Sequence, residues 1–135
     1  RKRSEGELGA AGQQRRVELF EHETTVAEAG IAAINEYWDP DRDWDYGRLE
    51  REHGLVALPN QPFMHGLARA IGPLVKYYRA TGYGPALGLA TVLKNKCLAE
   101  VFDADGSYDR ERFGEHTHST TCVMSSLAQL ADLTS

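Results

Sequence analysis

The sequence Glu115-His116-Thr117-His118 places one carboxyl group and two imidazoles within four residues. Carboxyl groups act as general acids, general bases or nucleophiles, and imidazole is the side chain that changes charge near neutral pH. An apolar pattern with helical spacing follows from His118 onward, so these groups stand where a helix begins. We therefore predict that Glu115, His116 and His118 are the catalytic residues of any site in this chain.

Three interpretations of the His-x-His pair remain open. A zinc or iron site needs three or more ligands, and residues 108–112 do not form the apolar strand that precedes such a pair in amidohydrolase-type metal sites. Thr117 or Ser119 could instead cap the helix, with the imidazoles hydrogen-bonded in a loop. The third interpretation is a polar surface that faces substrate. We expect neither a metal nor a cofactor.

A second polar stretch, residues 38–46, alternates acidic side chains with large aromatic ones. This mixture suits carbohydrate, because the apolar faces of sugars stack on aromatic rings while carboxylates bind sugar hydroxyls. The alternative is a hydrated turn whose aromatic side chains cover the core. On the first interpretation, Trp44 and Tyr46 bind substrate.

Apolar residues recur at helical intervals in four segments, which predicts an all-α protein. Asp39-Pro40 ends the first segment, and Gly72-Pro73 predicts a kink within the second. The short link around Gly82 predicts that the second and third helices form an antiparallel hairpin. A shorter helical turn, 48–53, ends at Gly54. The four segments are about 13–37, Pro62 to about 81, 85–101, and 118 to the last residues.

Composition bounds the class of protein. The 135 residues are 41% hydrophobic and 26% charged, which is ordinary for one globular domain. We expect a single helical domain over 1–135 with residues 1–12 frayed. The net charge of −5 disfavours nucleic acid, and no apolar run is long enough to span a membrane. Cys97 and Cys122 read as free thiols, and the compartment is not indicated.

Two stretches of this sequence share a pattern: a histidine at the start of an apolar helix, and a polar ending. MHGL (64–67) leads to KYYRATG (76–82), and GEHTHS (114–119) leads to LAQLADLT (127–134). The pattern resembles the repeating hairpins of (α/α) toroid carbohydrate-active enzymes, which include unsaturated glucuronyl hydrolases, other glycoside hydrolases and polysaccharide lyases. The resemblance covers about residues 59–135. It implies a partial (α/α) toroid, and hence a fragment of a larger protein.

The resemblance also implies a function. Helix starts in such a toroid open onto a sugar-binding cleft, so we expect a glycoside hydrolase that acts on saccharides containing uronic acid. Glu115 would be the acid or base, and the two neighbouring histidines would bind hydroxyls or a uronate carboxylate. His65, Trp44 and Tyr46 would line the cleft. The alternatives are a polysaccharide lyase of the same fold and a noncatalytic helical-repeat module that binds protein.

The expected partners are a carbohydrate substrate and a second copy of the chain. Four helices with one-sided apolar patterns leave a flank uncovered if the toroid is incomplete, and large exposed apolar patches are uncommon on soluble monomers. We therefore expect self-association through the face that contains Met124, Leu127 and Leu130, or fraying of the last helix.

Overall fold

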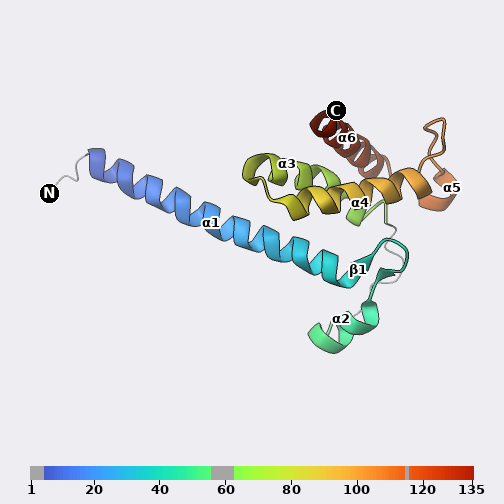
Figure 1. The fold of residues 1–135 in the computed structure, drawn as a ribbon, viewed down its shortest axis with the longest axis horizontal. Helices are drawn as coiled ribbons and strands as arrows, with labels where there is room; N and C mark the ends of the chain where they lie inside the picture. Colours follow the sequence, from blue (N-terminus) through green and yellow to red (C-terminus); the bar gives the residue numbers. More distant parts are fainter. Residues whose placement is uncertain (1–4, 56–62, 115) are drawn as a thin grey trace. The chain divides into compact units, whose positions relative to one another are not determined.

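The computed structural model describes residues 5–55, 63–114 and 116–135. The predicted all-α class is confirmed, with one short two-stranded sheet in addition (Figure 1). None of the described helices is both long enough and apolar enough to cross a membrane. In chain order the elements are α1 (Glu5–Tyr37), β1 (Trp38–Asp39), β2 (Asp43–Trp44), α2 (Tyr46–His53), the 3₁₀ helix η1 (Leu67–Ala70), α3 (Ile71–Thr81), α4 (Gly84–Glu100), α5 (Arg110–Phe113) and α6 (Thr117–Thr134).

The chain divides into two compact units, Arg1–Glu36 and Tyr37–Ser135. The first consists of α1, which is drawn as one uninterrupted helix and begins at Glu5, earlier than the predicted residue 13 (Figure 1). Fraying of residues 1–12 concerns motion and stays a prediction. The second unit contains every other element and all of the predicted site residues.

Most helix ends lie where the sequence predicts them. α1 ends at Tyr37, before Asp39-Pro40, because proline cannot continue the helical hydrogen-bond ladder. α2 ends at Gly54 and α3 ends at Gly82, whose φ angles are 65° and 71°. Glycine adopts positive φ without steric cost, so it ends both helices.

The start of the second predicted helix is wrong. Residues 63–66 form turns, η1 follows, and the α-helix begins only at Ile71, while Pro62 lies outside the described residues. Pro73 therefore lies in the first turn of α3. The backbone N–H groups of a first turn have no acceptor within the helix, so proline, which lacks this group, loses no hydrogen bond there. Gly72-Pro73 marks the beginning of a helix and not the predicted kink within one.

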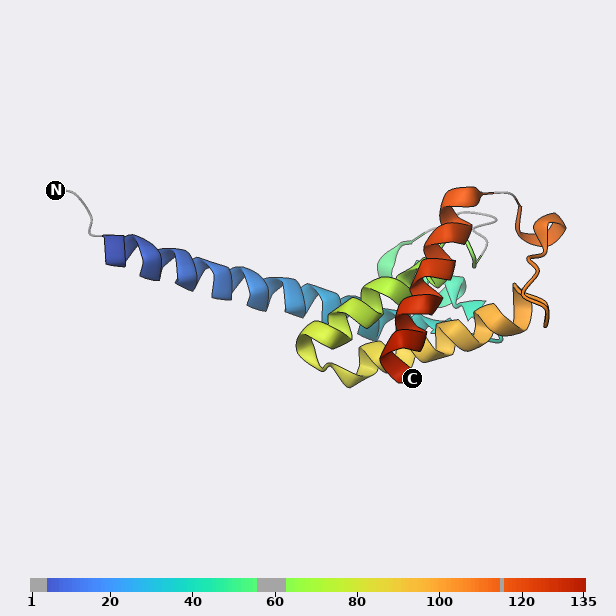
Figure 2. The ribbon, with the colours of Figure 1, turned by 90° about the horizontal axis from the view of Figure 1, so that it is seen from above.

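α3 is the central helix of the second unit. It packs against α4, its partner in an antiparallel hairpin, and against α6 (Figure 2). Apolar side chains from the three helices form the core, and each fully buried aliphatic side chain contributes about 1.5–3 kcal/mol. The buried side chains include Ile71, Leu74 and Val75 from α3, Leu89, Leu93 and Cys97 from α4, and Val123 and Leu130 from α6.

α3 and α6 run in the same direction, with contacts at both ends. Near their starts, the rings of His65 and His116 lie 5.3 Å apart between centroids. Near their ends, Arg79 donates a hydrogen bond of 2.5 Å to Asp132. Two helices that meet at both starts and both ends are parallel neighbours, although α4 and the short α5 separate them in sequence.

The β-hairpin is attached to α4 through Lys96. The Lys96 side chain is only 12% exposed. Its ammonium group donates hydrogen bonds to the carbonyl oxygen of Pro40 and to Glu100 Oε1. It also lies 5.5 Å from the ring centroid of Phe63, within cation–π range. The Phe63 ring stacks on that of Trp38 in β1, with centroids 6.0 Å apart. One cation therefore joins three segments.

α3 and α6 approach each other closely at Gly72 and Ser126. A Cβ atom on Gly72 would lie 2.6 Å from Ser126 Oγ and 3.3 Å from its Cβ. Ser126 is 2% exposed, and its hydroxyl donates to the carbonyl oxygen of Cys122 at 2.7 Å. The hydroxyl has little freedom to move aside, so only glycine fits at residue 72.

We predict that Gly72→Ala lowers the free energy of unfolding by about 1–3 kcal/mol, because the added methyl group forces α3 and α6 apart. The control is Gly88→Ala in α4, where a Cβ meets no atom within 4 Å and where alanine raises stability by about 0.5–1 kcal/mol. Urea denaturation of both variants measures the difference. A neutral or stabilising effect of Gly72→Ala contradicts the close contact.

Candidate functional site

Three histidines from two helix starts gather in the second unit. His65 precedes η1, whereas His116 and His118 belong to the start of α6. The ring of His116 lies between the other two, 5.3 Å from that of His65 and 6.3 Å from that of His118, measured between centroids. The structure thus brings together three of the six side chains that the sequence nominates.

His116 caps α6. Its Nδ1 atom accepts a hydrogen bond of 3.2 Å from the backbone N–H of Ser119, and the Ser119 hydroxyl lies at the same distance. The structure thus differs from the open interpretation in which Thr117 or Ser119 caps the helix, because the imidazole of His116 accepts from the free N–H group of Ser119. Since Nδ1 is an acceptor, a neutral His116 ring carries its hydrogen on Nε2.

His65 has a buried ring nitrogen with no hydrogen-bond partner. Its Nε2 atom is shielded from solvent and bonds to no described residue. Buried polar atoms are almost always paired, so an orphaned imidazole nitrogen needs an explanation. The ring lies beside Gly114, whose positive φ of 75° brings the backbone close.

Glu115 lies outside the described residues. Its catalytic role stays a prediction. The residues on either side are described, and both contribute to the histidine cluster: Gly114 packs near His65, and His116 lies in the middle.

A groove of about 630 Å³ runs between η1–α3 and α6. His118 shares the spacing of the α6 wall, because residues 118, 122, 125 and 129 fall on one helical face. We call it the α3–α6 groove; of the three clustered histidines, His65 is in its described lining and His116 and His118 are not. It is lined by His65, Gly66, Arg69, Ala70, Gly72, Pro73, Lys76, Cys122, Ser125, Ser126 and Gln129.

A second hollow, of about 510 Å³, lies on another face of α6. Its walls carry hydroxyl groups and one guanidinium group. Tyr108 there donates a hydrogen bond of 3.1 Å to the carbonyl oxygen of Gly114, which ties this wall to the chain beside the histidine cluster. Its lining residues are Ser107, Tyr108, Arg110, Thr117, Thr120 and Thr121.

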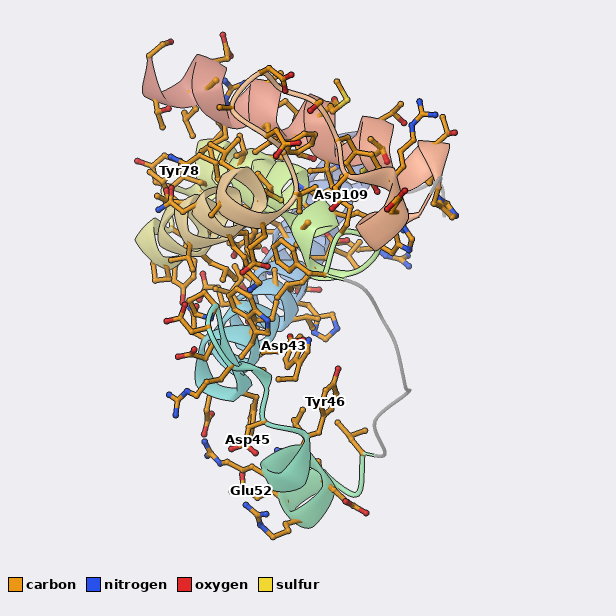
Figure 3. All side chains as sticks on the ribbon, turned by 90° about the vertical axis from the view of Figure 1, so that its right-hand side faces the viewer. Asp43, Asp45, Tyr46, Glu52, Tyr78 and Asp109 are labelled. Carbon is orange, nitrogen blue, oxygen red and sulfur yellow. The ribbon has the colours of Figure 1, made fainter. Side chains whose placement is uncertain are left out.

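The structure does not join Trp44 and Tyr46 to the histidines. Trp44 pairs with Trp38 across the β-hairpin, and Tyr46 begins α2 (Figure 3). Among the described residues, no hydrogen bond or ring contact connects them with the three imidazoles, and neither lines the two hollows. Their role in binding substrate stays a prediction.

The acidic residues of the 38–46 stretch make local hydrogen bonds. Asp39 accepts from the backbone N–H groups of Asp41 and Arg42, and the Asp41 bond is the main reason why the pKa of Asp39 is lowered. Asp43 accepts from the Trp38 indole at 3.0 Å, and Asp45 caps α2. These contacts agree with the turn interpretation of the stretch.

A further cluster of titratable groups, which the sequence analysis missed, holds α2 in place. The Tyr37 hydroxyl donates to Glu52 Oε2 at 2.7 Å and lies 2.9 Å from His53 Nε2. Arg48 lies 4.5 Å from the centroid of the Tyr37 ring and donates to Glu52 at 2.8 Å. Arg48, and then Tyr37, lower the pKa of Glu52. The Arg48–Glu52 spacing of four residues was the only signal in the sequence.

The sequence analysis also missed the polar walls of the groove, including Arg69, Lys76 and Gln129. Arg69 lies in the 3₁₀ helix η1 and Lys76 lies in α3, so no single helical period in the sequence connects them. The facing wall comes from a helix about 50 residues later. No protein-family model, no curated protein and no solved structure matches this chain. The geometry alone therefore carries the functional argument.

We predict that chelation leaves the melting temperature unchanged. No group of three or more histidine, cysteine, aspartate or glutamate side chains among the described residues is arranged to hold a metal ion, and a bound structural metal would stabilise the fold by linkage. Thermal melts before and after exhaustive EDTA dialysis provide the measurement. Stoichiometric zinc in elemental analysis of the purified chain contradicts the prediction.

We also predict that the two thiols differ in reactivity. Cys97 is fully buried, and burial raises its pKa to about 12, with a smaller contribution from Glu100. Cys122 is partly exposed in the groove wall. Because the thiolate is the nucleophile, iodoacetamide at pH 8 should modify Cys122 in the native protein and Cys97 only after unfolding. Peptide mass spectrometry distinguishes the two sites, and equal native rates contradict the prediction.

Proposed function

We propose that this chain is part of an (α/α) toroid protein that binds a saccharide at the histidine end of the α3–α6 groove and acts on it as a glycoside hydrolase. The observation that carries the proposal is the clustering of His65, His116 and His118 from two helix starts, with His65 in the wall of the open groove.

The arrangement of the helices supports the toroid part of the proposal. In such a toroid the inner helices run parallel to one another, and each pairs with an antiparallel outer helix. α3 and α6 are parallel neighbours, and α4 is the antiparallel partner of α3. The two stretches with the resemblance lie in matching positions, since each has a histidine at its start and a charged residue of the Arg79–Asp132 pair near its end.

The chemistry of the cluster supports saccharide binding. A neutral imidazole offers one donor and one acceptor, which matches the hydroxyl groups of a sugar. His65 Nε2 has no partner in the described structure, and His118 is exposed at the start of α6. A bound hydroxyl would pair the orphaned nitrogen without displacing any hydrogen bond within the protein.

Hydrolysis of a glycosidic bond requires a pair of carboxyl groups that flank it. No aspartate or glutamate belongs to the described lining of the groove, so Glu115 is the candidate for one of them. In the lyase alternative a histidine or tyrosine removes the proton next to a uronate carboxylate, and the product carries a new double bond. Absorbance of that double bond separates the two reactions. A noncatalytic helical-repeat module would give neither product.

We predict that His118→Ala abolishes binding of uronic-acid-containing oligosaccharides while leaving the melting temperature within about 1 °C of the wild type. The exposed imidazole contributes little to the core, because surface substitutions usually change stability by less than about 0.5 kcal/mol. Isothermal titration calorimetry and thermal melts measure the two effects. His22→Ala, an exposed histidine of α1, is the matched control.

A large fall in melting temperature for His118→Ala with unchanged binding would sink the proposal, since the histidine would then be structural. Glu115→Gln tests catalysis separately. It should remove turnover and retain binding, because glutamine keeps the shape of the side chain but cannot exchange a proton.

A further inference from the structure

We infer that the α3–α6 groove holds the acidic group of the saccharide, a carboxylate or a sulfate ester, between Arg69 and Lys76. The inference rests on the proposed function and deepens it, because it separates the part of the site that recognises charge from the histidine cluster at the other end. It begins from the charges of the groove walls.

The groove is basic within an acidic chain. Arg69 and Lys76 carry positive charge, and no described lining residue is acidic. The whole chain has a net charge of −5. A local concentration of positive charge against the mean attracts anions to this surface, since the potential in a cleft follows the charges that line it.

Arg69 and Lys76 are not neutralised within the described structure. Neither side chain forms a hydrogen bond or an ion pair with any described residue. Several other cations of the second unit have carboxylate partners, for example Arg48 with Glu52, Arg79 with Asp132, and Lys96 with Glu100. The two basic groups of the groove are therefore available to an external anion.

The opposite wall cannot supply the missing anion. Ser125, Ser126 and Gln129 of α6 are neutral, and Ser126 already donates to the carbonyl oxygen of Cys122. Gln129 donates to Ser125 at 3.3 Å. The acidic residue of α6 nearest in sequence, Asp132, is held by Arg79. Hydroxyl and amide groups facing two cations suit a ligand that is both polyhydroxylated and anionic.

The experiment compares three ligands by calorimetric titration of the 135-residue chain: trigalacturonate, its full methyl ester, and a sulfated neutral trisaccharide. The methyl ester keeps the hydroxyl groups and removes the charge. We expect the acid to bind at least about tenfold more tightly than the ester, because a charge-assisted hydrogen bond is the stronger kind. Added salt should weaken only the charged ligands.

Two substitutions locate the effect. Lys76→Gln and Arg69→Gln should each weaken binding of the acid about tenfold and leave binding of the ester unchanged. Arg51→Gln removes an exposed positive charge from α2, outside the groove, and should change neither. Slower alkylation of Cys122 by iodoacetamide in the presence of trigalacturonate gives an independent readout, because this thiol lies in the groove wall.

The outcomes separate the two proposals. Dependence of either acidic ligand on Lys76 and Arg69 supports the inference, and the ligand that shows it identifies carboxylate or sulfate. Equal affinity for acid and ester, with His118→Ala abolishing both, overturns the inference and leaves the proposed function standing. Wild-type affinity of Lys76→Gln and Arg69→Gln for the acid also overturns it. Binding of none of the three ligands overturns both.

Discussion

The contact between Gly72 and Ser126 is the constraint on which the second unit depends. Two parallel helices approach closely here because one of them has no side chain at the crossing. The same contact fixes the register of α3 against α6, so that His65 meets His116 at one end and Arg79 meets Asp132 at the other. A shift of one helical turn, about 5.4 Å, would separate both pairs and change the walls of the groove.

The histidine cluster shows how a structural role and a binding role divide among similar side chains. His116 satisfies the helix start through Nδ1. That hydrogen bond fixes the tautomer and the position of the His116 ring, and the rings of His65 and His118 lie beside this fixed ring. His65 retains an unpaired nitrogen, and His118 faces solvent. The sequence nominated His116 and His118 as catalytic and His65 as a residue of the cleft, but it did not show which ring nitrogens are paired, because a ring's hydrogen-bond partners depend on the fold.

Local signals in the sequence predicted local structure well. Gly54 and Gly82 end helices because only glycine adopts the required φ at low cost, and such a rule needs no tertiary information. The start of α3 was missed because apolar spacing continues through residues 63–70, and periodicity does not distinguish a 3₁₀ turn from the helix after it.

The candidate site was predictable only in part, for a related reason. The start of a helix can be recognised from the sequence, and this signal identified the histidines beside it. The groove walls come from residues about 50 positions apart, and their proximity follows from a close helix crossing that a single glycine permits. Leu130, expected on an exposed face, is only 2% exposed, whereas Met124 is 55% exposed. Self-association through that face stays a prediction, and because Leu130 is buried, the apolar surface exposed on that face is smaller than expected.

The contacts of Lys96 restrict which substitutions this sequence can accept during evolution. Its ammonium group serves a carbonyl oxygen, a carboxylate and an aromatic face at once, from a side chain that is only 12% exposed. A compact charge with rotatable donors can satisfy three directions, whereas a planar guanidinium presents its donors in one fixed fork. Arginine, the usual conservative replacement, would therefore fit this position poorly. Relatives that keep the β-hairpin on α4 should retain lysine here or change Pro40, Phe63 and Glu100 together.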